Sequence, residues 1–249
     1  MPATLARLLA DAHHSHATLE SSPALLPASL DAAMAVQVQT VQALGGKVGG
    51  WKVGFGADGK VMAAPMLAGA IVTSGAKWPL VAQGPLIAEV EIALRLKHDL
   101  PARPAKPYDR NDIIAATGEV LVGIEFIQSR LAENTAAPFP FWLADRLGNA
   151  GYICGAERVD FKNLDLGALR CQLWAEGELV HDKVGGHPQG DPLAPVLAWA
   201  NHQNESLGGM KAGQVITTGS LIVPPRCPAP VHLVAEIAGL GQVTVTVAG

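Results

Sequence analysis

Short apolar segments separated by turn residues set the main constraint on the fold of this chain. Its 249 residues include 27 glycines and 18 prolines, scattered between stretches that have the periodicity of strands. About ten strands and about four helices are predicted, and the two kinds of element do not alternate regularly along the chain. This order argues against a doubly wound parallel sheet and predicts a mixed, strand-rich α+β fold.

Two predicted helices precede the strands, over residues 3–17 and 29–45. Ser29 is placed to cap the second helix, which ends at a Gly-Gly pair. We therefore expect a helical N-terminal region, residues 1–46, and a mixed β-domain, residues 47–249, which carries the functional site. The two parts are expected to form one structural unit.

Composition excludes several classes of function. The chain is 49% hydrophobic and 16% charged, so it can bury a sizeable core, and its net charge is −4. It has no run of Lys and Arg that would indicate nucleic-acid binding, and no apolar run of the roughly 18 residues that span a membrane. Cys154, Cys171 and Cys227 lack the spacing of a metal site, and their odd number favours a reducing compartment. These features predict a cytoplasmic protein that binds neither nucleic acid nor membrane.

One glycine motif imitates a dinucleotide-binding site. The segment GFGADG, residues 54–59, matches the pattern G-x-G-x-x-G. That site also needs a helix directly after the glycines and an acidic residue about 20 positions further on. Here Pro65 interrupts the following segment, and no Asp or Glu occurs between Lys60 and Ala88. We therefore predict a turn.

Three glutamates lie in two predicted strands. Glu89 and Glu91 occupy alternate positions of LIAEVEIALRL, so their side chains share one face of that strand. Glu125 lies in VLVGIEFIQ, in which both faces are apolar, and an ionised carboxylate there needs a partner. Lys52 and Arg130 are the candidate partners.

Two interpretations of the glutamates stay open from these residues. In one, Glu89 and Glu91 form a solvated strand face and Glu125 makes an ion pair. In the other, all three hold a divalent cation, and three carboxylates without a neighbouring His or Cys suit Mg²⁺ or Mn²⁺ better than Zn²⁺.

Basic side chains supply further candidates. Lys52, in the short apolar segment GGWKVGFG, is expected to be partly buried, which would lower its pKa and suit it to proton transfer. His187, in the turn-rich segment GGHPQGDP, is expected to orient a substrate or to hold its own loop. His13, His14 and His16 are expected to be solvated on a surface helix.

The order of several motifs resembles a known family. The motifs are GGWKVG (49–54), PMLAGAI (65–71), AEVEIALRLKHDLP (88–101), VLVGIEFIQSR (120–130), GNAGYICG (148–155), GGHP (185–188), LAWAN (197–201) and GQVITTGS (213–220). They resemble, over roughly residues 28–222, the hydratase/decarboxylase branch of the fumarylacetoacetate hydrolase superfamily. This branch includes 2-keto-4-pentenoate hydratases and 4-oxalocrotonate decarboxylases.

The resemblance implies a fold and a set of roles. The fold would be a curled, fumarylacetoacetate hydrolase-like β-domain with a helical N-terminal region, assembled into homo-oligomers. It implies that Glu89, Glu91 and Glu125 bind Mg²⁺ or Mn²⁺ and that Lys52 acts in acid–base catalysis. It also implies that Thr218 and Ser220 bind the substrate, and we add His187 to these two.

The implied activity is that of a lyase acting on a small 2-oxo acid or its dienol. The expected reaction adds water to a 2-hydroxy-2,4-dienoate and gives a 4-hydroxy-2-oxo acid, in the breakdown of aromatic compounds. The alternatives are decarboxylation of a 2-oxo-3-enedioate, hydrolysis of the C–C bond of an acylpyruvate, and a non-catalytic subunit in a complex with a related hydratase or decarboxylase. The last alternative rests on Val72–Ser74, where members of the family commonly carry an acidic residue.

Overall fold

A computed structural model describes residues 2–56, 58–81, 85–222 and 230–248, so that Cys227 lies outside the described residues. The α-helices are α1 (Pro2–Ser15), α2 (Leu30–Ala43), α3 (Arg110–Ala116), α4 (Phe139–Ala144) and α5 (Leu193–His202). None of the helices in the described ranges is long and apolar enough to cross a membrane.

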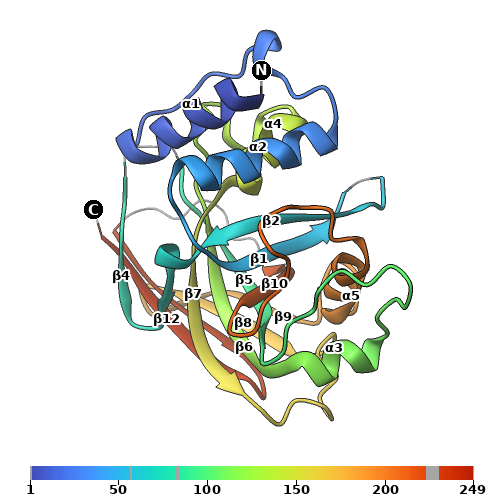
Figure 1. The fold of residues 1–249 in the computed structure, drawn as a ribbon. Helices are drawn as coiled ribbons and strands as arrows, with labels where there is room; N and C mark the ends of the chain where they lie inside the picture. Colours follow the sequence, from blue (N-terminus) through green and yellow to red (C-terminus); the bar gives the residue numbers. More distant parts are fainter. Residues whose placement is uncertain (1, 57, 82–84, 223–229, 249) are drawn as a thin grey trace.

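The strands form two sheets (Figure 1). The first sheet has the order β2 (Val61–Leu67), β1 (Val48–Phe55), β10 (Val215–Ile222), β5 (Ile87–Leu96), β6 (Thr117–Ile127), β7 (Asn149–Arg158) and β3 (Ile71–Thr73). The second has the order β4 (Ala76–Pro79), β12 (Gly241–Ala248), β11 (Val231–Ile237), β8 (Arg170–Ala175) and β9 (Glu178–Val184). Both sheets mix parallel and antiparallel pairs, which confirms the predicted strand-rich α+β class.

The main hydrophobic core lies between the two sheets. Val90 and Ile92 of β5 face it from the first sheet, and Leu233 and Val245 face it from the second. All four are buried, and each side chain of this size contributes about 1.5–3 kcal/mol when it leaves water. Because side chains alternate along a strand, Glu89 and Glu91 of β5 face the opposite side of the first sheet.

The N-terminal helices cover part of that opposite side. Leu5 of α1 and Val36 of α2 pack with Phe141 of α4 and Met62 of β2 in a second apolar cluster. Figure 1 shows α1 and α2 lying above the ends of the sheet strands, next to α4. These contacts attach the helices to the edge of the first sheet that β2 forms.

The hairpin of β1 and β2 explains the glycine motif. Gly54 and Phe55 of the motif belong to β1, and after them the N–H of Gly56 donates to the carbonyl of Lys60 at 2.9 Å, where the chain turns into β2. No helix follows the motif, so the prediction of a turn is confirmed. Pro65, which we expected to interrupt the segment, lies within β2. It is accommodated because β2 is an edge strand, where a missing N–H need not remove a bond between strands.

The cap of α2 gives a test of this region. Ser29 accepts a hydrogen bond from the N–H of Ala32 at 3.1 Å. The Ser29→Ala substitution removes this bond and should lower the free energy of unfolding by about 1 kcal/mol in urea denaturation. Ser22 precedes a short 3-10 helix without a side-chain cap. The control Ser22→Ala should therefore stay within about 0.5 kcal/mol of the parent, and equal losses in both variants would contradict the role of Ser29.

Candidate metal-binding site

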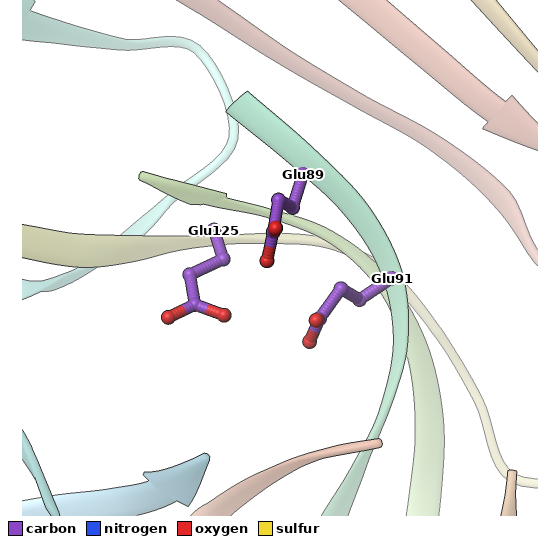
Figure 2. A group of neighbouring side chains, drawn as sticks. All are labelled: Glu89, Glu91 and Glu125. Carbon is purple, nitrogen blue, oxygen red and sulfur yellow. The ribbon is translucent and has the colours of Figure 1, made fainter. Parts of the chain in front are cut away.

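Two neighbouring strands bring the three glutamates together. Strands β5 and β6 are antiparallel, with Glu89 directly opposite Glu125 and Glu91 opposite Gly123. Opposed residues, and alternate residues of one strand, lie on the same face of a sheet. Figure 2 shows the three side chains projecting into a common space. The pairing register of β5 and β6 therefore builds the cluster.

The three carboxylates are close together and withdrawn from solvent. One oxygen of each lies within 4.8 Å of the corresponding oxygens of the other two. Glu91 and Glu125 are fully buried, and the side chain of Glu89 is 19% exposed. The interpretation of the two residues as a solvated strand face is therefore wrong for Glu91, which is fully buried, whereas Glu89 is partly buried.

Lys52 supplies the positive charge of the cluster. Its Nζ lies 3.0 Å from Oε2 of Glu125 and 3.4 Å from Oε2 of Glu89. The side-chain amide of Asn149, on β7, donates to Oε1 of Glu125 at 2.9 Å. Of the two partners that the sequence suggests for Glu125, Lys52 is the one found in the structure.

Arg130 has a different partner. Its Nε lies 2.6 Å from Oδ1 of Asp145, and both groups are buried. Its two other nitrogens donate to the backbone carbonyls of Asn149 and Asp145. This buried ion pair holds the segment that leads into β7 and leaves Lys52 as the cation beside Glu125.

The charges of the cluster shift one another's pKa values. Burial raises the pKa of Glu91 well above its ordinary value, and the charge of Glu125 raises it further. Burial also raises the pKa of Glu125, against the opposing effect of Lys52. Burial lowers the pKa of Lys52, but the carboxylates of Glu125, Glu89 and Glu91 outweigh burial and raise it. The predicted lowering of the Lys52 pKa is therefore wrong, because three carboxylates gather around this lysine.

The cluster has more negative groups than positive ones. Three carboxylates face one ammonium group, and neither oxygen of Glu91 has a hydrogen-bond partner although both are buried. An unpaired buried carboxylate is costly, whereas a hard divalent cation readily accepts such oxygens as ligands. The donor set therefore fits Mg²⁺ or Mn²⁺. Within the described part of the chain, no other group of three or more His, Cys, Asp or Glu side chains gathers this closely.

A cleft of about 240 Å³ opens beside the cluster. Lys52, Glu89 and Glu91 form its charged wall, and Phe55 and Met62 belong to its apolar wall. The remaining lining residues are Val53, Gly54, Leu147, Pro188, Gln189, Gly219 and Ser220. The cleft is smaller than the roughly 300–1,000 Å³ of drug-sized ligand sites, so it suits a small organic acid.

Of the three predicted substrate-binding residues, Ser220 lines this cleft. Strand β10 bulges just before Ser220, where Gly219 has a φ of 115° that favours glycine. The hydroxyl of Thr218 donates to the carbonyl of Ile92 at 2.7 Å, and Nε2 of His187 lies 2.8 Å from the carbonyl oxygen of Thr218. Thr218 and His187 thus hold the bulge that presents Gly219 and Ser220 to the cleft.

The N-terminal histidines lie away from the glutamates. His13 and His16 line a separate small hollow together with Arg130. His14 and His16 are exposed, as predicted, whereas His13 is half-buried. Burial and the nearby charge of Arg146 lower the pKa of His13 to about 4.

Two residues near the cluster had no role in the sequence analysis. The side chain of Asn149 donates a hydrogen bond to Glu125. Tyr152 lies opposite Glu125 in the register of β6 and β7. The buried hydroxyl of Tyr152 packs against Gly123, where a Cβ atom would collide with it. Both lie in the motif GNAGYICG, which carried part of the family resemblance, and this motif was the only available signal.

Comparison with known proteins bears on the family. No protein-family model matches the chain. A 2-keto-4-pentenoate hydratase of Burkholderia vietnamiensis (strain G4 / LMG 22486) is 32% identical over 159 residues, which are 64% of this chain and 59% of the relative. A 4-oxalocrotonate decarboxylase of Pseudomonas putida is 29% identical over 133 residues, which are 53% of this chain and 50% of the relative. These two matches therefore span between half and three fifths of the relatives' own length.

Solved structures agree in fold over almost the whole chain. The 4-oxalocrotonate decarboxylase of Pseudomonas putida G7, in complex with magnesium and adipate, superposes with a TM-score of 0.83 at 23% identity, covering 99% of this chain and 97% of that one. The chain is thus similar in sequence to 2-keto-4-pentenoate hydratases and 4-oxalocrotonate decarboxylases, and it shares the fold of the superposed decarboxylase, in agreement with the fold that the resemblance implies.

Proposed function

We propose that the protein is a metal-dependent lyase that adds water to a 2-hydroxy-2,4-dienoate of the 2-oxo-4-pentenoate type. The product is a 4-hydroxy-2-oxo acid. The observation that carries this proposal is the buried group of Glu89, Glu91 and Glu125 with Lys52 beside it, at the wall of a small cleft. Homology to 2-keto-4-pentenoate hydratases supports the reaction class.

Glu89, Glu91 and Glu125 are the proposed ligands of Mg²⁺ or Mn²⁺. The unpaired oxygens of Glu91 support this role, and the neighbouring decarboxylase structure is a magnesium complex. When bound, the cation supplies Lewis-acid stabilisation of negative charge on the 2-oxygen of the substrate. The pairing of Asn149 with Glu125 keeps that carboxylate in a fixed orientation, as the partners of metal ligands do.

Lys52 is the proposed general acid. It would give a proton to C5 of the dienol while the proton of the 2-hydroxyl group is released, which yields a 2-oxo-3-enoate. The oxygen of water then bonds to C4 and a proton bonds to C3, so that one water is added without oxidation or reduction. Gly219 and Ser220 line the cleft on the bulge of β10 and are the proposed contacts of the substrate carboxylate.

A decarboxylase is the second candidate. The superposition on the 4-oxalocrotonate decarboxylase favours it, since it covers 99% of this chain. Loss of CO₂ from a 2-oxo-3-enedioate needs the same stabilised negative charge, so the same glutamates would serve. The two activities differ in whether the substrate carries a second carboxylate. Assembly into homo-oligomers, alone or with a related subunit, is a proposal that rests on the family resemblance. A cytoplasmic location is a proposal that rests on the odd number of cysteines.

Metal binding is the first test of the site. Titration with Mn²⁺, followed by electron paramagnetic resonance, should show binding to the parent protein. Removal of a residue that hydrogen-bonds to a metal ligand typically weakens metal binding about 10–100-fold. Glu91→Gln and Glu125→Gln each remove a ligand itself, so each should weaken Mn²⁺ binding by about 100-fold or more. Glu119→Gln is a matched control, because Glu119 lies on the same strand as Glu125 but pairs with Arg95. Equal binding by Glu91→Gln and the parent would contradict the assignment.

The raised pKa of Glu91 predicts a specific dependence of stability on pH. Above the ordinary glutamate pKa of 4.5, the folded chain keeps a proton on Glu91 that the unfolded chain has lost. The folded state then binds more protons, and its stability falls as pH rises through the raised pKa. Without added metal, urea denaturation should show a steeper loss of stability above pH 4.5 in the parent than in Glu91→Gln. Parallel curves would contradict the burial of a protonated Glu91.

Turnover tests the reaction itself. Enzymatically generated 2-hydroxypenta-2,4-dienoate should lose its ultraviolet dienol band when the protein and Mg²⁺ or Mn²⁺ are present, and should keep it in the presence of a chelator. Glu125→Gln should abolish the loss, and Glu119→Gln should retain it. A stable dienol band with the metal shown to be bound would reject this hydratase activity. Release of CO₂ from 2-hydroxymuconate under the same conditions would instead establish the decarboxylase.

A further inference from the structure

A second, larger cavity adjoins the proposed active site. Its volume is about 550 Å³, and it lies between α2, the turn end of the β1–β2 hairpin and α5. In Figure 1, α2 lies above the hairpin and α5 lies below its turn end. Its apolar lining includes Leu30, Met34, Leu143 and Trp199. A cavity of this size can hold an apolar group of several carbon atoms.

The cavity and the cleft at the glutamates share part of their walls. Phe55 and Met62 line both spaces. Phe55 ends β1, three residues after Lys52, and Met62 is paired with Gly54 across the hairpin. The two spaces therefore adjoin at these two side chains. Methionine has an unbranched, adaptable side chain, so Met62 can give way to a ligand.

The charges around the cavity lie at its solvent side. Asp31, Lys60 and His202 are the charged or titratable side chains among its lining residues, and all three are exposed. Lys60 also pairs with Asp58. None of the described lining residues is a buried Lys or Arg, so a second carboxylate in the apolar part of the cavity would lose its hydration without a buried cation beside it.

We infer that this cavity binds the distal part of the substrate and that this part is an apolar chain. The inference rests on the proposed function, because the glutamates and Lys52 hold the 2-oxo acid end. It favours a 2-hydroxy-2,4-dienoate with an alkyl or aryl group at C5 over one with a carboxylate there. Phe55 and Met62 are then specificity-determining residues at the junction of the two spaces.

Binding of non-reacting analogues tests the inference apart from turnover. The probes are 2-oxopentanoate, 2-oxoheptanoate and 2-oxononanoate, with 2-oxoadipate as the acid that carries a distal carboxylate. Their dissociation constants are measured by calorimetry with the Mn²⁺-loaded protein. Each methylene that enters the cavity should tighten binding about three- to fourfold, and 2-oxoadipate should bind no better than 2-oxopentanoate.

Two alanines of α5 supply a matched pair of variants. Ala198 lines the cavity, whereas Ala194, one turn earlier on the same helix, does not. Ala198→Phe fills the cavity and should abolish the gain with chain length while leaving 2-oxopentanoate binding unchanged. Ala194→Phe adds the same side chain outside the cavity and should retain the gain.

The outcomes separate this inference from the proposed function. Three results would overturn the apolar subsite. They are equal affinity of the parent for the three monoacids, an increase in affinity with chain length that persists in Ala198→Phe, and tighter binding of 2-oxoadipate than of any monoacid. Metal-dependent hydration of 2-hydroxypenta-2,4-dienoate in the same preparation would leave the hydratase standing in each of these cases. No binding of 2-oxopentanoate to the metal-loaded protein would overturn both.

Discussion

The burial of three carboxylates around one lysine is the electrostatic constraint on which the rest of the site depends. Glu91 and Glu125 are fully buried, and Lys52 contacts Glu89 and Glu125 but leaves both oxygens of Glu91 without a hydrogen bond. Removal of an ion from water costs several kcal/mol unless it is paired. A divalent cation bound by the three glutamates would compensate these charges. The apolar packing of the surrounding sheets offsets the free energy that their burial costs.

The two-layer architecture makes this burial achievable. One face of β5 and β6 packs against the second sheet through residues such as Val90 and Ile124, so the strands are held firmly from that side. The opposite face is free to carry polar groups in a fixed register, with Glu89 opposite Glu125. Rigid strands position ligands more accurately than loops do. The bulge of β10, which Thr218 and His187 hold, and the loop residues Pro188 and Gln189 bound the cleft beside these strands.

Different elements of the fold line the two adjoining spaces and would contact different parts of a ligand. Strands β1, β5 and β6 provide the charges that would bind a 2-oxo acid, whereas α2, α5 and the end of the β1–β2 hairpin enclose an apolar cavity.

Local patterns in the sequence determined the strands, the turn at GFGADG, the cap at Ser29 and the shared face of Glu89 and Glu91, because each depends on residues only a few positions apart. Glu125 joined that pair because an ionised carboxylate in a strand with two apolar faces needs a partner, and the family resemblance implied the same three ligands. Only the tertiary structure decided that Lys52 rather than Arg130 pairs with Glu125, and that the pKa of Lys52 is raised. These outcomes depend on the register between distant strands and on burial from both faces, which set distances and desolvation that no local pattern contains.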